Sequence, residues 1–135
     1  MALKASDLSV GDTYSECLVE DLKRTQIVQY AGSSGDYNPL HTDEIFTTKV
    51  AGYPTVFAHG MLTMGMTGRM LTNYVGDGRL TKFGVRFTNQ VWPGDTLNST
   101  ATVEEVADGI VKLKVDTTNQ DGKTVVSGYA EARVD

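Results

Sequence analysis

The sequence predicts an α+β fold in which a curved antiparallel five-stranded sheet wraps around one long apolar helix. The segment 60–74 has a helical pattern that is apolar almost all round, which is typical of a helix enclosed in a core. From residue 80 onward, alternating polarity and recurrent turn signals favour a meander of antiparallel strands. A single apolar helix and such a meander pack most economically with the sheet curved around the helix.

Each element follows from a local signal. Glycine-rich turns separate the segments, Asn38-Pro39 is a cap followed by a first helical residue, and Asp121-Gly122 is a hairpin signal. The predicted elements are a strand over 13–20, helices over 22–31, 39–47 and 60–74, and strands over 80–91, 96–106, 110–115 and 124–134. Five strands leave two open edges, so we expect two chains to pair edge to edge as a dimer.

Composition limits the class of protein. At 135 residues the chain is expected to be one domain, 1–135, and a net charge of −5 without a basic run argues against nucleic acid as a partner. No apolar run approaches the roughly 18–20 residues needed to cross a bilayer, and residues 1–7 lack the apolar stretch of a signal peptide, so we expect no membrane association. The single cysteine, Cys17, favours a reducing cytoplasm and is predicted to be buried in the first strand.

The segment 34–44 carries the side chains best suited to chemistry. It holds Asp36 and His41, with Asn38-Pro39 between them. Pro39 has no backbone N–H, so a helix that comes from the preceding residues cannot continue past it. The chain is therefore expected to bend so that carboxylate and imidazole converge, and such a pair can add or remove water. The spacing alone favours a simpler interpretation, a capped turn with a solvated histidine.

Two longer patterns add to this reading. The first runs Tyr30-Ala31-Gly32-Ser33-Ser34-Gly35-Asp36-Tyr37-Asn38-Pro39-Leu40-His41-Thr42-Asp43, and the second runs Ala58-His59-Gly60-Met61-Leu62. Together they resemble the MaoC-like dehydratases, also called R-specific enoyl-CoA hydratases or hydratase 2, and especially their actinobacterial (3R)-hydroxyacyl-thioester dehydratase branch. Val85-Arg86-Phe87 and Pro93-Gly94-Asp95 are also similar to this family. The resemblance implies the hot-dog fold and favours catalysis over a capped turn.

The resemblance also implies roles for individual residues. Asp36 and His41 become the catalytic pair that activates water, and the reaction is reversible hydration of trans-2-enoyl thioesters to (3R)-3-hydroxyacyl thioesters. The backbone N–H of Gly60, at the start of a helix, is the expected oxyanion donor. Asn38 is assigned a supporting role or a simple cap, and His59 is expected to fix the turn into the helix. Where some members carry a small hydroxyl residue, this chain has Gly68.

Partners and alternatives follow from the same family. The expected substrate is an acyl-CoA or acyl-carrier-protein thioester, with no cofactor and no metal, in a homodimer or a heterodimer with a related subunit. The competing functions are a hot-dog acyl-CoA thioesterase and a non-catalytic acyl-thioester-binding subunit. Asp36, His41, Asp43 and Glu44 could form a metal cluster, but one histidine at this spacing matches no standard site.

Overall fold

The computed structural model describes residues 3–135. Its elements, in chain order, are η1 (Ala5–Asp7), β1 (Thr13–Val19), α1 (Arg24–Ser34), α2 (Pro39–Thr42), η2 (Phe46–Val50), α3 (Gly60–Val75), β2 (Leu80–Phe87), β3 (Leu97–Ala107), β4 (Ile110–Thr118) and β5 (Thr124–Arg133). The predicted order of one strand, three helical segments and four further strands is confirmed.

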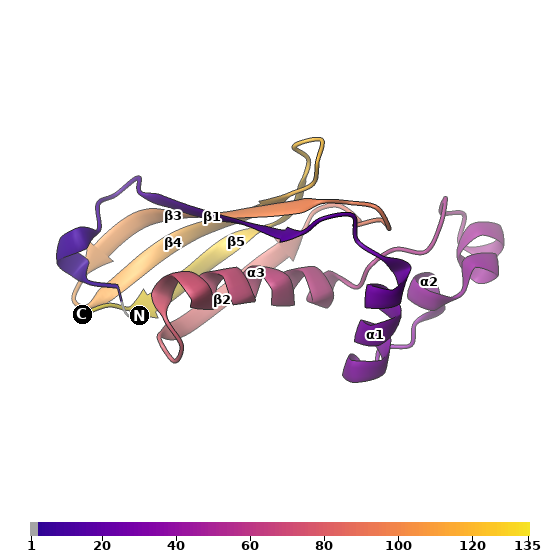
Figure 1. Cartoon of the computed structure of the whole chain (residues 1–135), viewed down its shortest axis with the longest axis horizontal. Helices are drawn as coiled ribbons and strands as arrows, with labels where there is room; N and C mark the ends of the chain where they lie inside the picture. The colour runs from indigo at the N-terminus through magenta and orange to yellow at the C-terminus, as the bar shows by residue number, and fades with distance from the viewer. Residues whose placement is uncertain (1–2) are drawn as a thin grey trace.

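The strands form one antiparallel sheet in the order β1-β3-β4-β5-β2. β1 and β2 are its edges, so the sheet is open, as the sequence predicted. The sheet curves past α3, and α1 and α2 lie beyond the end at which α3 begins (Figure 1). The predicted fold class, a five-stranded hot-dog, is confirmed.

The core lies between α3 and the sheet. The strands β3 and β4 alternate buried and exposed residues, and their buried positions, such as Val103 and Leu113, join Met70 and Leu71 of α3 in one apolar cluster. In the chain alone, α3 is not enclosed all round. Its first turn leaves Met61 more than half exposed.

Two threonines break the apolar pattern of the buried face of α3. Thr67 shares a hydrogen bond of 2.8 Å with Thr117 of β4, which donates to Ser99 of β3 at 2.9 Å. The hydroxyl of Thr63 is also buried, yet it has no hydrogen-bond partner within residues 3–135. A chain of buried hydrogen bonds through Thr67, Thr117 and Ser99 therefore joins α3 to the middle of the sheet.

Several boundaries differ from the prediction. α1 begins two residues later than expected, because the backbone N–H of Lys23, the residue before its first turn, donates to the Gln26 side-chain oxygen at 2.9 Å, as in a capping box. It continues to Ser34, and Gly35 ends it in the left-handed region at φ 78°. The predicted helix over 39–47 is divided at Asp43, which is extended and whose carboxylate accepts from the Phe46 N–H at 3.1 Å.

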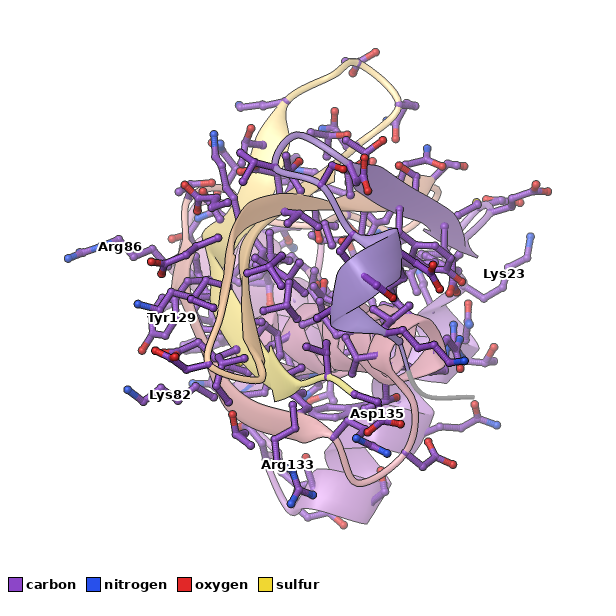
Figure 2. The ribbon with its side chains drawn as sticks, turned by 90° about the vertical axis from the view of Figure 1, so that its left-hand side faces the viewer. Lys23, Lys82, Arg86, Tyr129, Arg133 and Asp135 are labelled. Carbon is purple, nitrogen blue, oxygen red and sulfur yellow. The ribbon has the colours of Figure 1, made fainter. Side chains whose placement is uncertain are left out.

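The outer surface of β2 and β5 is polar. Lys82, Arg86 and Tyr129 point away from the helix side of the sheet (Figure 2). The prediction that Cys17 is buried is wrong: it lies on an exposed position of the edge strand β1. No helix within the described residues is long and apolar enough to cross a membrane.

Candidate active site

The segment between α1 and α2 bends as predicted. The Asp36 carboxylate accepts from the Asn38 N–H at 3.2 Å, and the Asn38 side chain accepts from the Leu40 N–H at 3.0 Å. These two side-chain turns satisfy the N–H groups of Asn38 and Leu40 on either side of Pro39, the first residue of α2. Asn38 is therefore a helix cap whose own backbone N–H also holds the Asp36 carboxylate.

His41 is oriented by a second segment of the chain. Its Nδ1 donates to the Phe57 carbonyl at 2.6 Å, and the Phe57 N–H donates to the Leu40 carbonyl at 3.2 Å. Because a carbonyl can only accept, Nδ1 carries the proton and the neutral ring keeps its lone pair on Nε2. Burial lowers the pKa of His41, and the Phe57 carbonyl raises it in part. The ring is thus arranged as a neutral proton acceptor.

Asp36 and His41 meet at a third side chain, His59. One donor atom from each of the three lies within 4.8 Å of the other two. The rings of His41 and His59 stack, with centroids 3.9 Å apart and planes 24° apart. A single water molecule with hydrogen bonds of about 2.8 Å can bridge groups at such a separation. The predicted convergence of carboxylate and imidazole is present in the structure.

His59 lies at the start of α3, as expected, but it makes contacts that the sequence did not predict. It stands at the N-cap position of α3 without capping the helix by its side chain. The ring is 2% exposed, and its Nε2 donates to the backbone carbonyl of Asp36 at 2.9 Å. The prediction that it merely fixes the turn into the helix missed this bond and the stacking on His41. The only signal in the sequence was that the chain has two histidines, each within a motif.

Gly60 opens α3, so its N–H has no carbonyl one turn earlier within the helix. It lines a cavity of about 320 Å³ beside the ends of β2 and β5. The other lining residues are Phe57, Ala58, Thr63, Phe87, Thr88, Asn89, Gln90, Val91, Val125 and Val126. The positive end of the helix dipole therefore lies at a cavity whose lining includes both apolar side chains and the amides of Asn89 and Gln90.

Asp36 and His41 are not among the residues that line this cavity. His41 and the cavity are nevertheless adjacent, because Phe57 accepts the His41 hydrogen bond and also lines the cavity. The structure thus brings the predicted pair together as one group and places Gly60 in a neighbouring one.

The comparison with protein families decides the relationship of the chain. A family model described as "MaoC like domain" matches residues 7–125. The chain belongs to the MaoC-like family.

Two curated proteins are similar in sequence to this MaoC-like chain over about three quarters of its length. The 3-hydroxyacyl-thioester dehydratase Y of Mycobacterium tuberculosis is 38% identical over 104 residues, which are 75% of this chain and 33% of that protein. The peroxisomal enoyl-CoA hydratase 2 of Arabidopsis thaliana is 39% identical over 103 residues, 74% of this chain and 32% of that protein. The chain spans about a third of the length of either relative.

A solved structure extends the similarity to almost the whole MaoC-like chain. The unliganded R-hydratase PhaJ1 of Pseudomonas aeruginosa superposes with a TM-score of 0.84 at 28% identity, and the match covers 98% of this chain and 86% of that one. The elements of the two chains therefore share one arrangement, including the position of α3 against the sheet.

The small residues of α3 have separate explanations in this MaoC-like fold. A Cβ on Gly68 would lie 3.3 Å from the ring of Phe83, so the glycine lets the ring of a β2 residue pack against the helix. Gly65, three residues earlier, has no neighbour within 4 Å of its would-be Cβ. Of the two, only Gly68 is required by a close contact.

A divalent ion in this region would have to use Asp36, His41 and His59, since Asp43 and Glu44 are engaged elsewhere. Asp43 accepts from Phe46, and Glu44 pairs with Arg24. Donor atoms around a tetrahedral zinc lie roughly 3.4 Å apart, from bonds of about 2.1 Å. The trio spans up to 4.8 Å, so its side chains would have to draw together to bind such an ion.

Proposed function

We propose that this chain, as a single MaoC-like domain over 1–135, catalyses the reversible hydration of trans-2-enoyl thioesters to (3R)-3-hydroxyacyl thioesters. The observation that carries the proposal is the convergence of Asp36 and His41 within 4.8 Å, next to the free end of α3 at Gly60. The names of the relatives, a 3-hydroxyacyl-thioester dehydratase, an enoyl-CoA hydratase 2 and an R-hydratase, support the same chemistry.

Hydration begins with one water held between the Asp36 carboxylate and Nε2 of His41. His41 takes a proton from this water as the water oxygen forms a bond to the β carbon. The π electrons move to the thioester oxygen, which becomes an enolate. The enolate then takes the proton from the imidazolium at its α carbon, so that one O–H bond is broken, one C–O and one C–H bond are formed, and His41 is neutral again.

The role of Gly60 in this scheme is electrostatic. Negative charge builds on the thioester oxygen, and the N–H at the start of α3 is a preorganised donor for it. Removing one such donor typically costs about 2.7–4 kcal/mol of transition-state stabilisation. The glycine matters because any Cβ there would lie 3.1 Å from the Phe87 ring, which narrows the approach to the N–H.

We further propose that the chain acts as a homodimer, or as a heterodimer with a related subunit, in the cytoplasm. Two features support pairing: the sheet has open edges at β1 and β2, and Met61 and Phe87, which flank Gly60, are both more than half exposed. A reducing compartment is supported by Cys17, which has no second cysteine in the sequence. Light scattering on the purified chain, alone and with candidate subunits, tests the assembly.

The direct test follows the absorbance of the conjugated thioester in crotonyl-CoA and in longer enoyl-CoA substrates, with free thiol measured in the same samples. We expect absorbance to fall without thiol release, and the product to have the (3R) configuration. Thiol release without hydration would instead identify a thioesterase. Binding of the thioester without either change would identify a non-catalytic subunit.

A further inference from the structure

The least expected part of the molecule is the surrounding of His59. This ring is 2% exposed, so it does not meet solvent, yet it contacts both members of the proposed catalytic pair. Its Nε2 donates to the backbone carbonyl of Asp36 at 2.9 Å, and its face stacks on His41 at 3.9 Å. Tyr30 of α1 closes the other side, edge to face, with centroids 4.9 Å apart.

We propose that His59 is the positioning residue of this site, which sets the Asp36 segment and the His41 ring at a fixed separation. The inference rests on the proposed hydratase function and adds to it a third side chain that touches neither water nor substrate. Two different contacts do this: the Nε2–H bond fixes the main chain that carries the carboxylate, and the ring face fixes the imidazole.

The pattern of protonation supports this role. The bond to the Asp36 carbonyl requires the proton of His59 on Nε2, whereas the bond of His41 to the Phe57 carbonyl requires its proton on Nδ1. The two stacked rings must therefore hold opposite tautomers. The remaining nitrogen of His59, Nδ1, is buried without a hydrogen-bond partner in residues 3–135, so the ring gains polar stabilisation only from the Asp36 carbonyl.

The loop that carries Asp36 depends strongly on this bond. Its other hydrogen bonds are local: the Asp36 N–H donates to the Ser34 hydroxyl at 3.1 Å, and its carboxylate accepts from Asn38. Local turns fix the shape of a loop but not its distance from another segment. The bond from His59 connects Asp36 to a residue 23 positions away, at the start of the core helix.

Two substitutions separate the two contacts. His59→Gln keeps an N–H near the position of Nε2 and loses the ring, whereas His59→Phe keeps the ring and loses the donor. We expect kcat on an enoyl-CoA to fall about 100-fold for His59→Phe, since misplacement by about 1 Å costs that much, with KM nearly unchanged. His59→Gln should recover to within about tenfold of the parent chain.

The control is Thr67→Val, which removes a buried hydrogen bond further along the same helix and should leave kcat within about twofold, since it displaces nothing in the site. A folded His59→Phe protein with the parent kcat would overturn the proposal. So would a His59→Gln protein no more active than His59→Phe.

A measurement on the unmodified protein decides the matter even if the variants do not fold. The chain has only two histidines, so nitrogen NMR of its imidazoles reports His41 and His59 alone. At a pH about one unit above the ordinary imidazole pKa, we expect one ring with its proton on Nδ1 and the other, assigned to His59, with its proton on Nε2. A proton on Nδ1 of His59 would exclude the bond to Asp36 and with it the proposal.

These outcomes are distinct from failure of the proposed function. If the unmodified chain does not hydrate enoyl thioesters, the function is wrong, whereas the tautomers of the two rings still report whether His59 holds the Asp36 segment.

Discussion

The rings of His41 and His59 lie face to face, with 3.9 Å between their centroids. One is the proposed proton acceptor, and the other is enclosed by the protein and holds the Asp36 carbonyl. The acceptor therefore has protein, not water, on one entire face. Several testable properties of the chain depend on this enclosure.

The first is the pH dependence of activity. Burial lowers the pKa of His41 below its ordinary value of 6.5, with a smaller contribution from His59 in the same direction, while the Phe57 carbonyl and Asp36 act in the opposite direction. Since the neutral ring accepts the proton, we expect the acid limb of kcat/KM to have its midpoint below 6.5. A pH–rate profile checks this, and a midpoint above that value contradicts it.

The same lowered pKa has a consequence for stability. Between the folded and unfolded pKa values of His41, the unfolded chain binds more protons, so the free energy of unfolding falls as pH drops below about 6.5 and through the folded value. Denaturant titrations of the parent chain and of His41→Ala at several pH values isolate this contribution. The difference between the two proteins should diminish toward acid pH.

Removing either member of the proposed catalytic pair, Asp36 or His41, should reduce turnover by about 10²–10⁴-fold, the usual contribution of a positioned acid or base. In Asp36→Asn the side chain keeps the oxygen that accepts from Asn38, so the loop should retain its shape. The matched control is Asp43→Asn, the same change in the same segment, where the oxygen that accepts from Phe46 is also kept. His41→Ala completes the set. Near-parental rates from a folded Asp36 or His41 variant would remove that residue from the mechanism.

Gly60 and Gly65, which both lie on α3, form a second matched pair. A Cβ at 60 would lie 3.1 Å from the Phe87 ring, whereas a Cβ at 65 has no neighbour within 4 Å. We expect Gly60→Ala to lower kcat/KM about 10- to 100-fold, and Gly65→Ala to leave it unchanged while raising the free energy of unfolding by about 0.4–1 kcal/mol. Shortening Phe87 to alanine in the Gly60→Ala background should recover part of the rate. Equal rates for the two single variants would contradict the prediction.

The buried threonines should differ in their effect on stability. Thr117 bonds to both Thr67 and Ser99, whose hydroxyls also donate to backbone carbonyls, so Thr117→Val removes two buried hydrogen bonds and should cost about 1–3 kcal/mol of unfolding free energy. Thr63→Val removes a hydroxyl without a partner among the described residues, and should cost less or stabilise the chain. Urea denaturation measures both, and a larger loss for Thr63→Val would contradict this.

Chelation tests whether Asp36, His41 and His59, whose side chains lie close together, bind a metal ion. We expect dialysis against a strong chelator to leave turnover unchanged, because the proposed steps use water, the side chains of Asp36 and His41 and the N–H of Gly60, and no metal ion. Loss of activity on chelation, with recovery on adding zinc alone, would assign Asp36, His41 and His59 to a metal instead.

The sequence predicted the architecture well where periodicity was strong. The alternation in 110–115 and the apolar pattern of 60–74 each correspond to an observed element, β4 and α3. Boundaries set by side-chain hydrogen bonds were less accessible. Asp43 divides a predicted helix because its carboxylate bonds three residues ahead, and no periodic signal reports such a bond.

The candidate site was predictable in part for a similar reason. Asp36 and His41 are five residues apart, so a bend at Pro39 was sufficient to bring them together. His59 approaches them from 23 residues beyond Asp36, and tertiary contacts place it there, including the backbone bonds from Phe57 to Leu40 and from Ala58 to Val91. The exposure of Cys17 also depends on tertiary structure. β1 is an edge strand with one face against the core, and Cys17 lies at one of its exposed positions.

The separation between the proton-transfer side chains and the cavity at Gly60 has an evolutionary consequence. Phe87, Val125 and Val126 shape that cavity from β2 and β5, and none of them contributes a hydrogen bond to the histidines. Substitutions along these strands can therefore accumulate without disturbing acid–base chemistry. If the proposed function holds, descendants of such a chain can diversify in the acyl groups they accept while inheriting one unaltered reaction.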